Sequence, residues 1–552
     1  MNKTARTALI HVKSAPKPAK PAALPAAALL AALLAATSAS ADVRLPSVFG
    51  DTMVIQRDMP VPVWGDADSG EKVTVILQGF GKSDTPDPLM RASETRTART
   101  TAGTDGRWMV RLRKLPAGGP YRMTVAGKNT VAFENVAVGE VWVCSGQSNM
   151  WWTVELVEGI ADVVAAARYP SLRFFSVAMV SREEPQFDFT GAKPKWVECS
   201  PETAKKFSAA AFFFGKNLQA EFGIPVGLIH SSWGGSVAEA WTSMGGLRTN
   251  PVLRPIVDNL DSLKAVYPRA REEYQKRAAD IEKARKEGRV APFALSPRGP
   301  GERDWPSGLY NAMIAPMIPY AIRGVIWYQG ESNSVRAAQY RTLFPAMIRD
   351  WRKAWGKGNF PFLFVQLANW NTEVIPVEGT WGSWPELREA QLMTLRLPDT
   401  GMAVAIDIGD STNIHPNNKM EVGRRLALAA LHVAYGRDIE WSGPIYRSMK
   451  RSGSAIRLRF DHTTGGLTTL GGRPLTGFEI AGSNRVFRSA EARIEGREVV
   501  VSNPALTDPV AVRYGWDDNP YCTLANGTGL PASPFRTDRW PGVTEGKVRP
   551  EN

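Results

Sequence analysis

A serine that follows a run of apolar residues is the first candidate for chemistry in this sequence. Residues 141–143 are Val-Trp-Val, which suit a buried strand, and the polar run 145–149 (Ser-Gly-Gln-Ser-Asn) follows after Cys144. In open α/β sheets, ligands bind at the carboxyl ends of strands. A serine hydroxyl becomes a nucleophile when a base takes its proton. Ser148 is therefore a candidate nucleophile, and Gly146 permits a tight turn before it.

The chain has five histidines that could serve as this base. His415 follows a predicted strand and precedes Pro416 and a predicted helix, so it lies in the kind of loop from which a base reaches a strand-end site. We predict that His415 is the base. His230, which ends another predicted strand, is the alternative. The remaining three lie in the N-terminal leader, late on a helix and in a C-terminal β-rich region: His11, His432 and His462.

The elements that must position these residues fall into three regions. Residues 42–136 consist of short alternating runs divided by Gly, Pro and Asp, which predict a β-sandwich or jelly-roll domain. Residues 137–438 alternate near-continuous apolar strands with helices, which predicts an α/β domain with a parallel sheet covered on both faces. Residues 439–552 return to a β-rich pattern. The charged segment 271–289 predicts an exposed helical insertion at about residues 250–300.

In the α/β region the predicted elements can be bounded from their patterns. After the strand that precedes Ser148, the predicted strands are 172–177, 224–231, 323–329, 361–368 and 401–407. The predicted helices are 205–223, 337–355 and 418–436.

Residues 1–41 are predicted to be a secretory signal peptide. They begin with a basic, acid-free stretch, continue with the Ala- and Leu-rich run 24–36, and end in Ala-Ser-Ala at 39–41. The apolar run is shorter than the roughly 20 residues that span a bilayer. We therefore expect cleavage before Asp42, a secreted or periplasmic mature protein, and no membrane partner.

Composition narrows the remaining classes of function. The formal net charge is +13, but part of it lies in the leader and the rest is not gathered into long runs, so no nucleic-acid partner is expected. Three cysteines do not make a disulfide scaffold. There is no His, Cys and carboxylate cluster with the spacing of metal ligands, so we expect no metal and no cofactor. No pattern in the sequence indicates the oligomeric state.

Four motifs give the chain a resemblance to a known family. They are GQSNM at 146–150, SSWGGSVAEAW at 231–241, WYQGESN at 327–333 and IHPNNK at 414–419. With these motifs in this order, the chain resembles the sialate O-acetylesterase family, serine esterases of the SGNH-hydrolase type. The resemblance extends from residue 45 to residue 538. It implies an SGNH-like three-layer esterase domain flanked by N- and C-terminal β-domains.

The resemblance also implies roles for individual residues. Ser148 matches the family's nucleophile and His415 its base. Gly235 matches the backbone N–H donor that receives the negative charge of a tetrahedral intermediate, and Gln329 matches the side-chain amide donor. Such donors are worth about 2.7–4 kcal/mol each. Glu331 matches a motif residue too, and we expect it to be a scaffold residue.

The sequence departs from the family beside the histidine. Relatives carry an aspartate two or three residues before the base, whereas here these positions hold Asn413 and Thr412. Three arrangements remain open. Asn413 or a backbone carbonyl receives the imidazole proton and leaves a Ser–His dyad, Asp410 folds back as the acid, or catalysis is impaired. In the serine-protease template, an Asp→Asn change costs about 10⁴ in kcat.

The substrate implied by the resemblance is an O-acetylated carbohydrate. The acetylated sugar is sialic acid or a plant polysaccharide such as acetylxylan. Trp151, Trp152 and Trp233 lie beside the motifs and are candidates to pack on sugar rings. Two other functions compete with this one: a carbohydrate-binding protein that kept the fold without turnover, and an SGNH lipase or thioesterase with a long apolar acyl channel.

Overall fold

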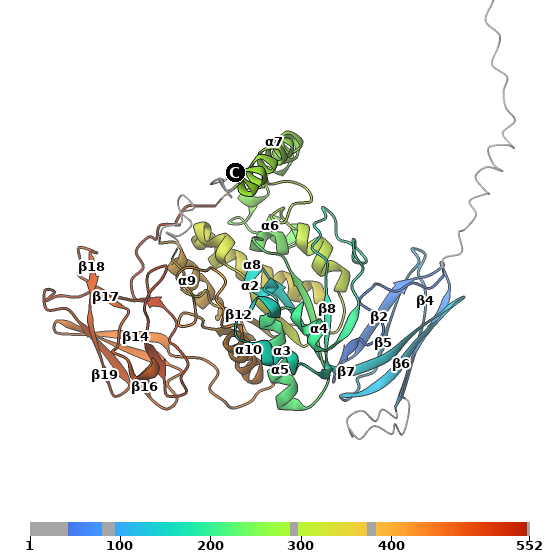
Figure 1. The fold of residues 1–552 in the computed structure, drawn as a ribbon, viewed down its shortest axis with the longest axis horizontal. Helices are drawn as coiled ribbons and strands as arrows, with labels where there is room; N and C mark the ends of the chain where they lie inside the picture. The colour runs from blue at the N-terminus through green and yellow to red at the C-terminus, as the bar shows by residue number, and fades with distance from the viewer. Residues whose placement is uncertain (1–41, 80–93, 288–295, 372–381, 549–552) are drawn as a thin grey trace, which may run out of the picture.

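The computed structural model describes residues 42–79, 94–287, 296–371 and 382–548. The predicted leader, residues 1–41, lies outside the described residues. Figure 1 shows a central α/β region with β-rich regions on either side, blue at the N-terminal end and orange-red at the C-terminal end.

The centre of the protein is a sheet of seven strands. Neighbouring strands are parallel except for the edge pair β8–β9, which is antiparallel. The predicted parallel sheet is thus confirmed, with one antiparallel edge strand added. The strand order is β13 (Thr400–Ala403), β12 (Phe362–Val365), β11 (Gly324–Tyr328), β7 (Thr130–Gly146), β10 (Val226–Ser232), β8 (Tyr169–Ser176) and β9 (Trp196–Cys199).

Helices cover both faces of this sheet. Side chains alternate between the faces along a strand, so Trp142 and Cys144 of β7 join one apolar cluster and Val141 and Val143 join the other. The first cluster includes residues of α5 (Ala209–Phe222) and α10 (Lys419–Val433), and the second those of α8 (Ala337–Trp355).

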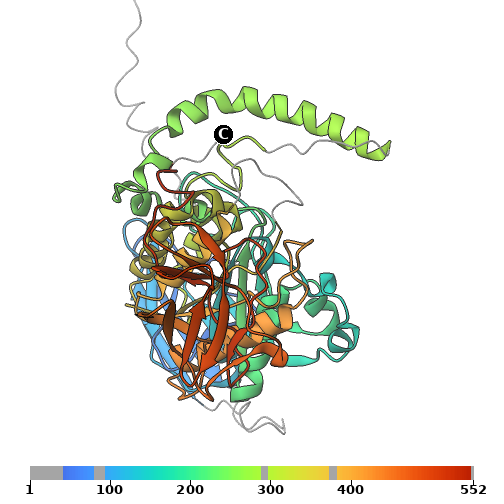
Figure 2. The ribbon, with the colours of Figure 1, turned by 90° about the vertical axis from the view of Figure 1, so that its left-hand side faces the viewer.

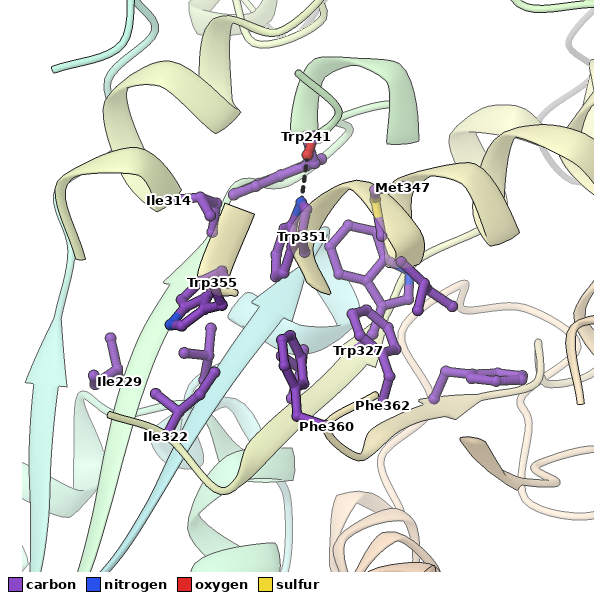
Figure 3. Close-up of a cluster of buried hydrophobic side chains, with 14 of the residues drawn as sticks. Ile229, Trp241, Ile314, Ile322, Trp327, Met347, Trp351, Trp355, Phe360 and Phe362 are labelled. Carbon is purple, nitrogen blue, oxygen red and sulfur yellow. Dashed lines mark hydrogen bonds between the residues drawn. The ribbon is translucent and has the colours of Figure 1, made fainter. Parts of the chain in front are cut away.

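The second cluster is rich in tryptophan. Figure 3 shows Trp327, Trp351 and Trp355 packed together, with the Trp351 indole donating a 2.8 Å hydrogen bond to the Trp241 carbonyl. Trp241, Trp327 and Trp351 are fully buried. This aromatic packing fixes α8 against the sheet.

The N-terminal β-region shares a strand with the central sheet. β7 pairs with β1 (Val54–Gln56) and β6 (Gly118–Ala126) along its first half, and with β10 and β11 along its second half. The predicted boundary after residue 136 falls inside this strand. The other strands of the region are β2 (Val61–Asp66), β3 (Lys72–Gly79), β4 (Thr95–Thr101) and β5 (Arg107–Leu112).

A buried carboxylate strengthens this junction. Glu140 of β7 is fully buried and accepts hydrogen bonds from Arg323, at 2.8 and 3.2 Å, from Gln56 at 3.1 Å, and from Arg57. These bonds lower the pKa of Glu140 although burial opposes the shift. The carboxylate therefore stays charged and joins β1 to the central sheet.

The C-terminal β-region contains two four-stranded sheets and a two-stranded sheet. Arg388 of α9 (Trp384–Thr394) fastens it to the central region, because its fully buried guanidinium donates to the carbonyls of Ala368 (2.9 Å), Asp517 (2.6 Å) and Asp518 (2.8 Å). The strands are β14 (Ile445–Ser452), β15 (Ala455–Asp461), β16 (Leu467–Thr469), β17 (Phe478–Ala481), β18 (Phe487–Ser489), β19 (Glu491–Glu495), β20 (Glu498–Ser502), β21 (Ala511–Tyr514), β22 (Leu524–Asn526) and β23 (Phe535–Arg536).

The predicted insertion contains the long helix α7 (Leu260–Lys286), which follows the short α6 (Met244–Arg248). Figure 1 shows α7 at the top of the central region, seen nearly along its axis, and Figure 2 shows it from the side as a long helix above the rest of the fold. Most of its described side chains are exposed. Within the described residues, no helix is both long and apolar enough to cross a bilayer.

Candidate active site

The candidate nucleophile stands at the carboxyl end of the central strand. Between residues 141 and 150, all of which the structure describes, Ser148 is the one residue that is not buried. β7 ends at Gly146, where φ is +138°, and the short helix α2 (Ser148–Trp151) begins two residues later. A Cβ atom on Gly146 would lie 2.1 Å from the Tyr328 carbonyl oxygen. The glycine therefore lets the turn pass close to β11 and expose the serine.

The Gly-Gly turn after β10 lies directly beside this serine. A Cβ atom on Gly234 would lie 3.4 Å from the Ser148 Cβ, and Gly235 has a left-handed φ of +72°. The Gly235 N–H makes no hydrogen bond within the described part of the chain. The Ser148 N–H is at the start of a helix, where N–H groups have no intrahelical partner. Two backbone donors thus remain for a substrate oxygen.

Gln329 serves a different purpose in this arrangement. Its side chain is fully buried, and Nε2 donates to Asn333 Oδ1 at 2.7 Å and to the Ser236 carbonyl at 3.2 Å. Its Oε1 accepts from the Tyr340 hydroxyl at 2.9 Å. Both amide hydrogens are therefore used inside the protein, to hold the turn that follows Gly235. The predicted donor role of Gln329 stays a prediction, and it requires one of these bonds to break.

His415 lies in the loop between β13 and α10. Its ring stacks on Trp152, with the ring centroids 4.5 Å apart and the planes at 19°. The Trp152 N–H donates a 2.7 Å hydrogen bond to the Ser148 carbonyl, so the stacking partner of the histidine closes the turn that the serine begins. No hydrogen bond joins the ring to Ser148 Oγ in the described structure. Catalytic hydrogen bonds commonly tighten only when substrate binds.

The imidazole of His415 is in the protonation state that a general base needs. Burial and the nearby charge of Lys419 lower the pKa of His415 to about 4. The ring is therefore neutral near pH 7 and able to accept a proton.

The other described histidines have their own partners. His230 Nε2 lies 2.6 Å from Ser232 Oγ, and burial lowers the pKa of His230 to about 4. His432 contacts the Arg437 carbonyl and His462 contacts Glu440. Of the described histidines, His415 is the one that stacks on Trp152, in the turn that begins at Ser148 (the nucleophile turn).

Asn413 and Asp410 both build the loop in front of His415. The Asn413 Oδ1 accepts the His415 backbone N–H at 2.9 Å. The Asp410 Oδ1 accepts the N–H of Thr412 at 2.8 Å, its hydroxyl at 2.8 Å and the Asn413 N–H at 3.2 Å. These hydrogen bonds lower the pKa of Asp410. In the described structure, neither side chain bonds to the imidazole ring of His415, and the identity of the third triad member stays a prediction.

Sequence analysis did not single out three residues around this site. Arg303 packs over Gly235, since a Cβ atom on that glycine would lie 2.9 Å from the Arg303 Cζ. Asn149 and Lys419 are buried and bonded to each other behind the histidine loop. Lys419 carried a usable signal, because a cation in the first turn of a helix opposes the helix dipole and needs another reason to be there.

Comparisons with known proteins give the family of the chain. Residues 298–432 match the family model described as carbohydrate esterase, sialic acid-specific acetylesterase. The chain is 30% identical to the sialate O-acetylesterase of Mus musculus, over 90% of this chain and 95% of the mouse protein. It is also 30% identical to the sialate O-acetylesterase of Homo sapiens, over 74% of each chain.

A solved structure is similar over the same length. The crystal structure of a carbohydrate acetylesterase from Xanthomonas citri matches with a TM-score of 0.75 and 38% identity, over 90% of this chain and all of that one. These matches show a carboxylic-ester hydrolase of the kind that removes O-acetyl groups from carbohydrates. The chain belongs to the sialate O-acetylesterase family.

Proposed function

We propose that this protein removes O-acetyl groups from a sugar through an acyl-serine intermediate, with Ser148 as the nucleophile and His415 as the base. The observation that carries the proposal is the exposure of Ser148 at the end of the central strand. Backbone N–H groups without hydrogen-bond partners among the described residues lie on one side of it, and a neutral imidazole is stacked on its own turn.

The reaction follows from these groups. His415 takes the proton of Ser148 Oγ while that oxygen attacks the acetyl carbonyl carbon. The carbonyl oxygen becomes an oxyanion, which the N–H groups of Ser148 and Gly235 receive. The sugar oxygen then leaves with the proton from His415. A water molecule, deprotonated by the same imidazole, attacks the acetyl-serine and releases acetate and free Ser148.

Side chains around Ser148 favour a sugar that carries a carboxylate. Trp151 is 37% exposed, and Trp152 and Trp233 are half-buried beside the turn, so aromatic faces are available to sugar rings. Arg303 is half-buried over Gly235 and makes no ion pair or hydrogen bond with another described residue. A guanidinium fork of this kind binds carboxylates with two hydrogen bonds. We therefore propose an O-acetylated sialic acid as substrate in preference to acetylxylan.

Replacing Arg303 with methionine is expected to change substrate selectivity. The unbranched, uncharged side chain keeps apolar contacts and loses the charged donors. We expect kcat/KM for O-acetyl sialic acid to fall about tenfold to a hundredfold further than for a neutral acetylated xylo-oligosaccharide. The control is the sialic acid methyl ester, which has no carboxylate and should be affected like the neutral sugar. Equal losses on all three substrates would contradict the role of Arg303.

The proposed place of action is outside the cytoplasm. The basic and apolar leader of residues 1–41 supports export to the periplasm or the medium. A sugar esterase in that compartment meets polysaccharides and glycoconjugates directly.

A screen of esters with the purified mature protein tests the function. We expect acetate release from O-acetylated sugars, and faster turnover of p-nitrophenyl acetate than of longer acyl esters. Sugar binding without acetate release would indicate the non-catalytic alternative. A preference for long acyl chains would indicate a lipase or thioesterase.

A further inference from the structure

The backbone around His415 is held by three side chains. Asn413 accepts the His415 N–H. The carbonyl before the histidine, that of Ile414, accepts the Asn149 Nδ2 at 3.0 Å. The carbonyl after it, that of Pro416, accepts the Lys419 Nζ at 2.8 Å. The peptide group before the candidate base and the one that follows Pro416 are therefore both held by side chains.

Two of these anchors are bonded to each other. The Lys419 Nζ donates to the Asn149 Oδ1 at 2.6 Å, and the Asn149 Nδ2 also donates to the Glu331 Oε1 at 2.6 Å. Lys419 is fully buried, Asn149 is 2% exposed and Glu331 is 8% exposed. Since Asn149 directly follows Ser148, this chain of bonds connects the nucleophile turn to the histidine loop.

Burying a lysine and a glutamate here is costly for folding. Each ion loses its hydration, at a cost of several kcal/mol that their attraction only partly offsets. Burial lowers the pKa of Lys419 to about 7 and raises the pKa of Glu331, and each group opposes the shift of the other. The Glu331 Oε2 and the Tyr328 hydroxyl have no hydrogen-bond partner among the described residues. Apolar residues of similar volume would be less costly to the free energy of folding here. The buried Lys419, Glu331 and Asn149 therefore indicate a functional constraint.

We propose that Asn149 and Lys419 form a clamp that positions His415 against Ser148, with Glu331 as the counter-charge of the lysine. This inference rests on the proposed function, and it names positioning residues, not catalytic ones. The clamp orients the base through its backbone, whereas the triad aspartate orients an imidazole through its ring. It thereby supplies part of what Asn413 and Asp410 do not supply at the ring.

The clamp also sets the charge around the base. The groups that face Lys419 are Glu331, the Tyr328 ring at 5.4 Å, Asn149 and His415. Burial and, to a lesser extent, the positive charge of Lys419 disfavour imidazolium, so His415 stays neutral to lower pH than an ordinary histidine. Without that charge, the pKa of His415 should rise part of the way toward its usual value near 6.5, because burial, the larger cause of the shift, remains.

Lys419→Met tests both parts of the clamp. Methionine keeps an unbranched side chain and removes the donor and the charge. We expect kcat on p-nitrophenyl acetate to fall at least about tenfold with little change in KM, because a small misplacement of the base is costly. The acid limb of the pH profile, where kcat/KM falls as His415 becomes protonated, should move to higher pH.

Asn149→Ala separates the positioning effect from the charge effect. It removes the bonds to Ile414, Lys419 and Glu331 but no charge, so kcat should fall similarly while the acid limb moves less. Because the two residues share one hydrogen bond, the double variant should lose less than the product of the two single losses. If Lys419→Met does not fold, the Asn149→Ala result still decides whether the clamp acts.

The matched control is Asn418→Ala. The Asn418 side chain caps the same helix by accepting the Glu421 N–H at 3.1 Å, and in the described structure it makes no hydrogen bond to the histidine loop. It should lower thermal stability without moving the acid limb. If Lys419→Met and Asn149→Ala both kept the kcat and the acid limb of the wild type, the clamp would be overturned. Turnover by wild type that does not require Ser148 would instead overturn the proposed function.

Discussion

Replacing Ser148 with alanine is expected to lower kcat on O-acetylated sugars and on p-nitrophenyl acetate by a factor on the order of 10⁴–10⁶. The alanine has no oxygen to form the acyl intermediate, so the residual rate comes from binding and the backbone donors alone. The structure should persist, because the Ser148 side chain is partly exposed and its Oγ makes no hydrogen bond in the described structure. Stopped-flow or steady-state ester hydrolysis with a folded variant measures the loss.

A second Ser–His pair in the same sheet provides the control. Ser232 lies within 2.6 Å of His230, and both are buried. Ser232→Ala should therefore keep most of the esterase activity. A large loss in Ser232→Ala together with near-normal turnover in Ser148→Ala would move the chemistry to the His230 pair and contradict the proposed mechanism.

Replacing Gly146 with alanine is expected to have the largest effect on folding and activity together. The added methyl group would lie 2.1 Å from the Tyr328 carbonyl oxygen and 2.7 Å from its carbonyl carbon. Both atoms belong to β11, the strand paired with β7, so no flexible side chain can move aside. We expect a loss of at least about 3 kcal/mol in the free energy of unfolding. Any folded fraction should have strongly reduced kcat, because the turn carries Ser148.

Gly70→Ala is the matched control for this change. Gly70 also has a positive φ, +75°, but a Cβ atom there would meet no atom within 4 Å. It should cost only about 1 kcal/mol, the penalty of the left-handed conformation. Urea unfolding of both variants measures the difference. Equal midpoints would show that the contact with Tyr328 is unimportant.

The central sheet could be predicted from the sequence because its signals are local. The predicted helix 337–355 coincides with α8, whose apolar face repeats at helical spacing and whose end is marked by the left-handed Gly356. The predicted strand 323–329 corresponds to β11 within one residue at each end. The predicted domain boundary after residue 136 does not coincide with the end of a strand, because β7 runs from Thr130 to Gly146. Nothing in the residue pattern reveals that the two regions share this strand.

The candidate site was predictable only in part. Ser148 and His415 could be found because each follows an apolar strand with polar residues that a core does not tolerate. Lys419 could not be recognised as a buried group, although its place in the first turn of a helix was a signal, since a lysine near a helix start is ordinarily solvated. Its burial depends on Asn149, which lies 270 positions away in the sequence. Arg303 could not either, because its relation to Gly235 arises from the fold and not from spacing.

The shared strand β7 has a mechanical consequence. Its 17 residues extend for about 56 Å. One end is hydrogen-bonded into the N-terminal sheet, and the other leads directly into the turn that presents Ser148. The two parts therefore cannot hinge about a linker. A truncated protein starting near residue 137 would lack β1, leave residues 137–139 of β7 without these pairing partners, and loosen the support beneath Ser148. The N-terminal region is best regarded as the anchorage of Ser148, the proposed nucleophile, and not as a detachable module.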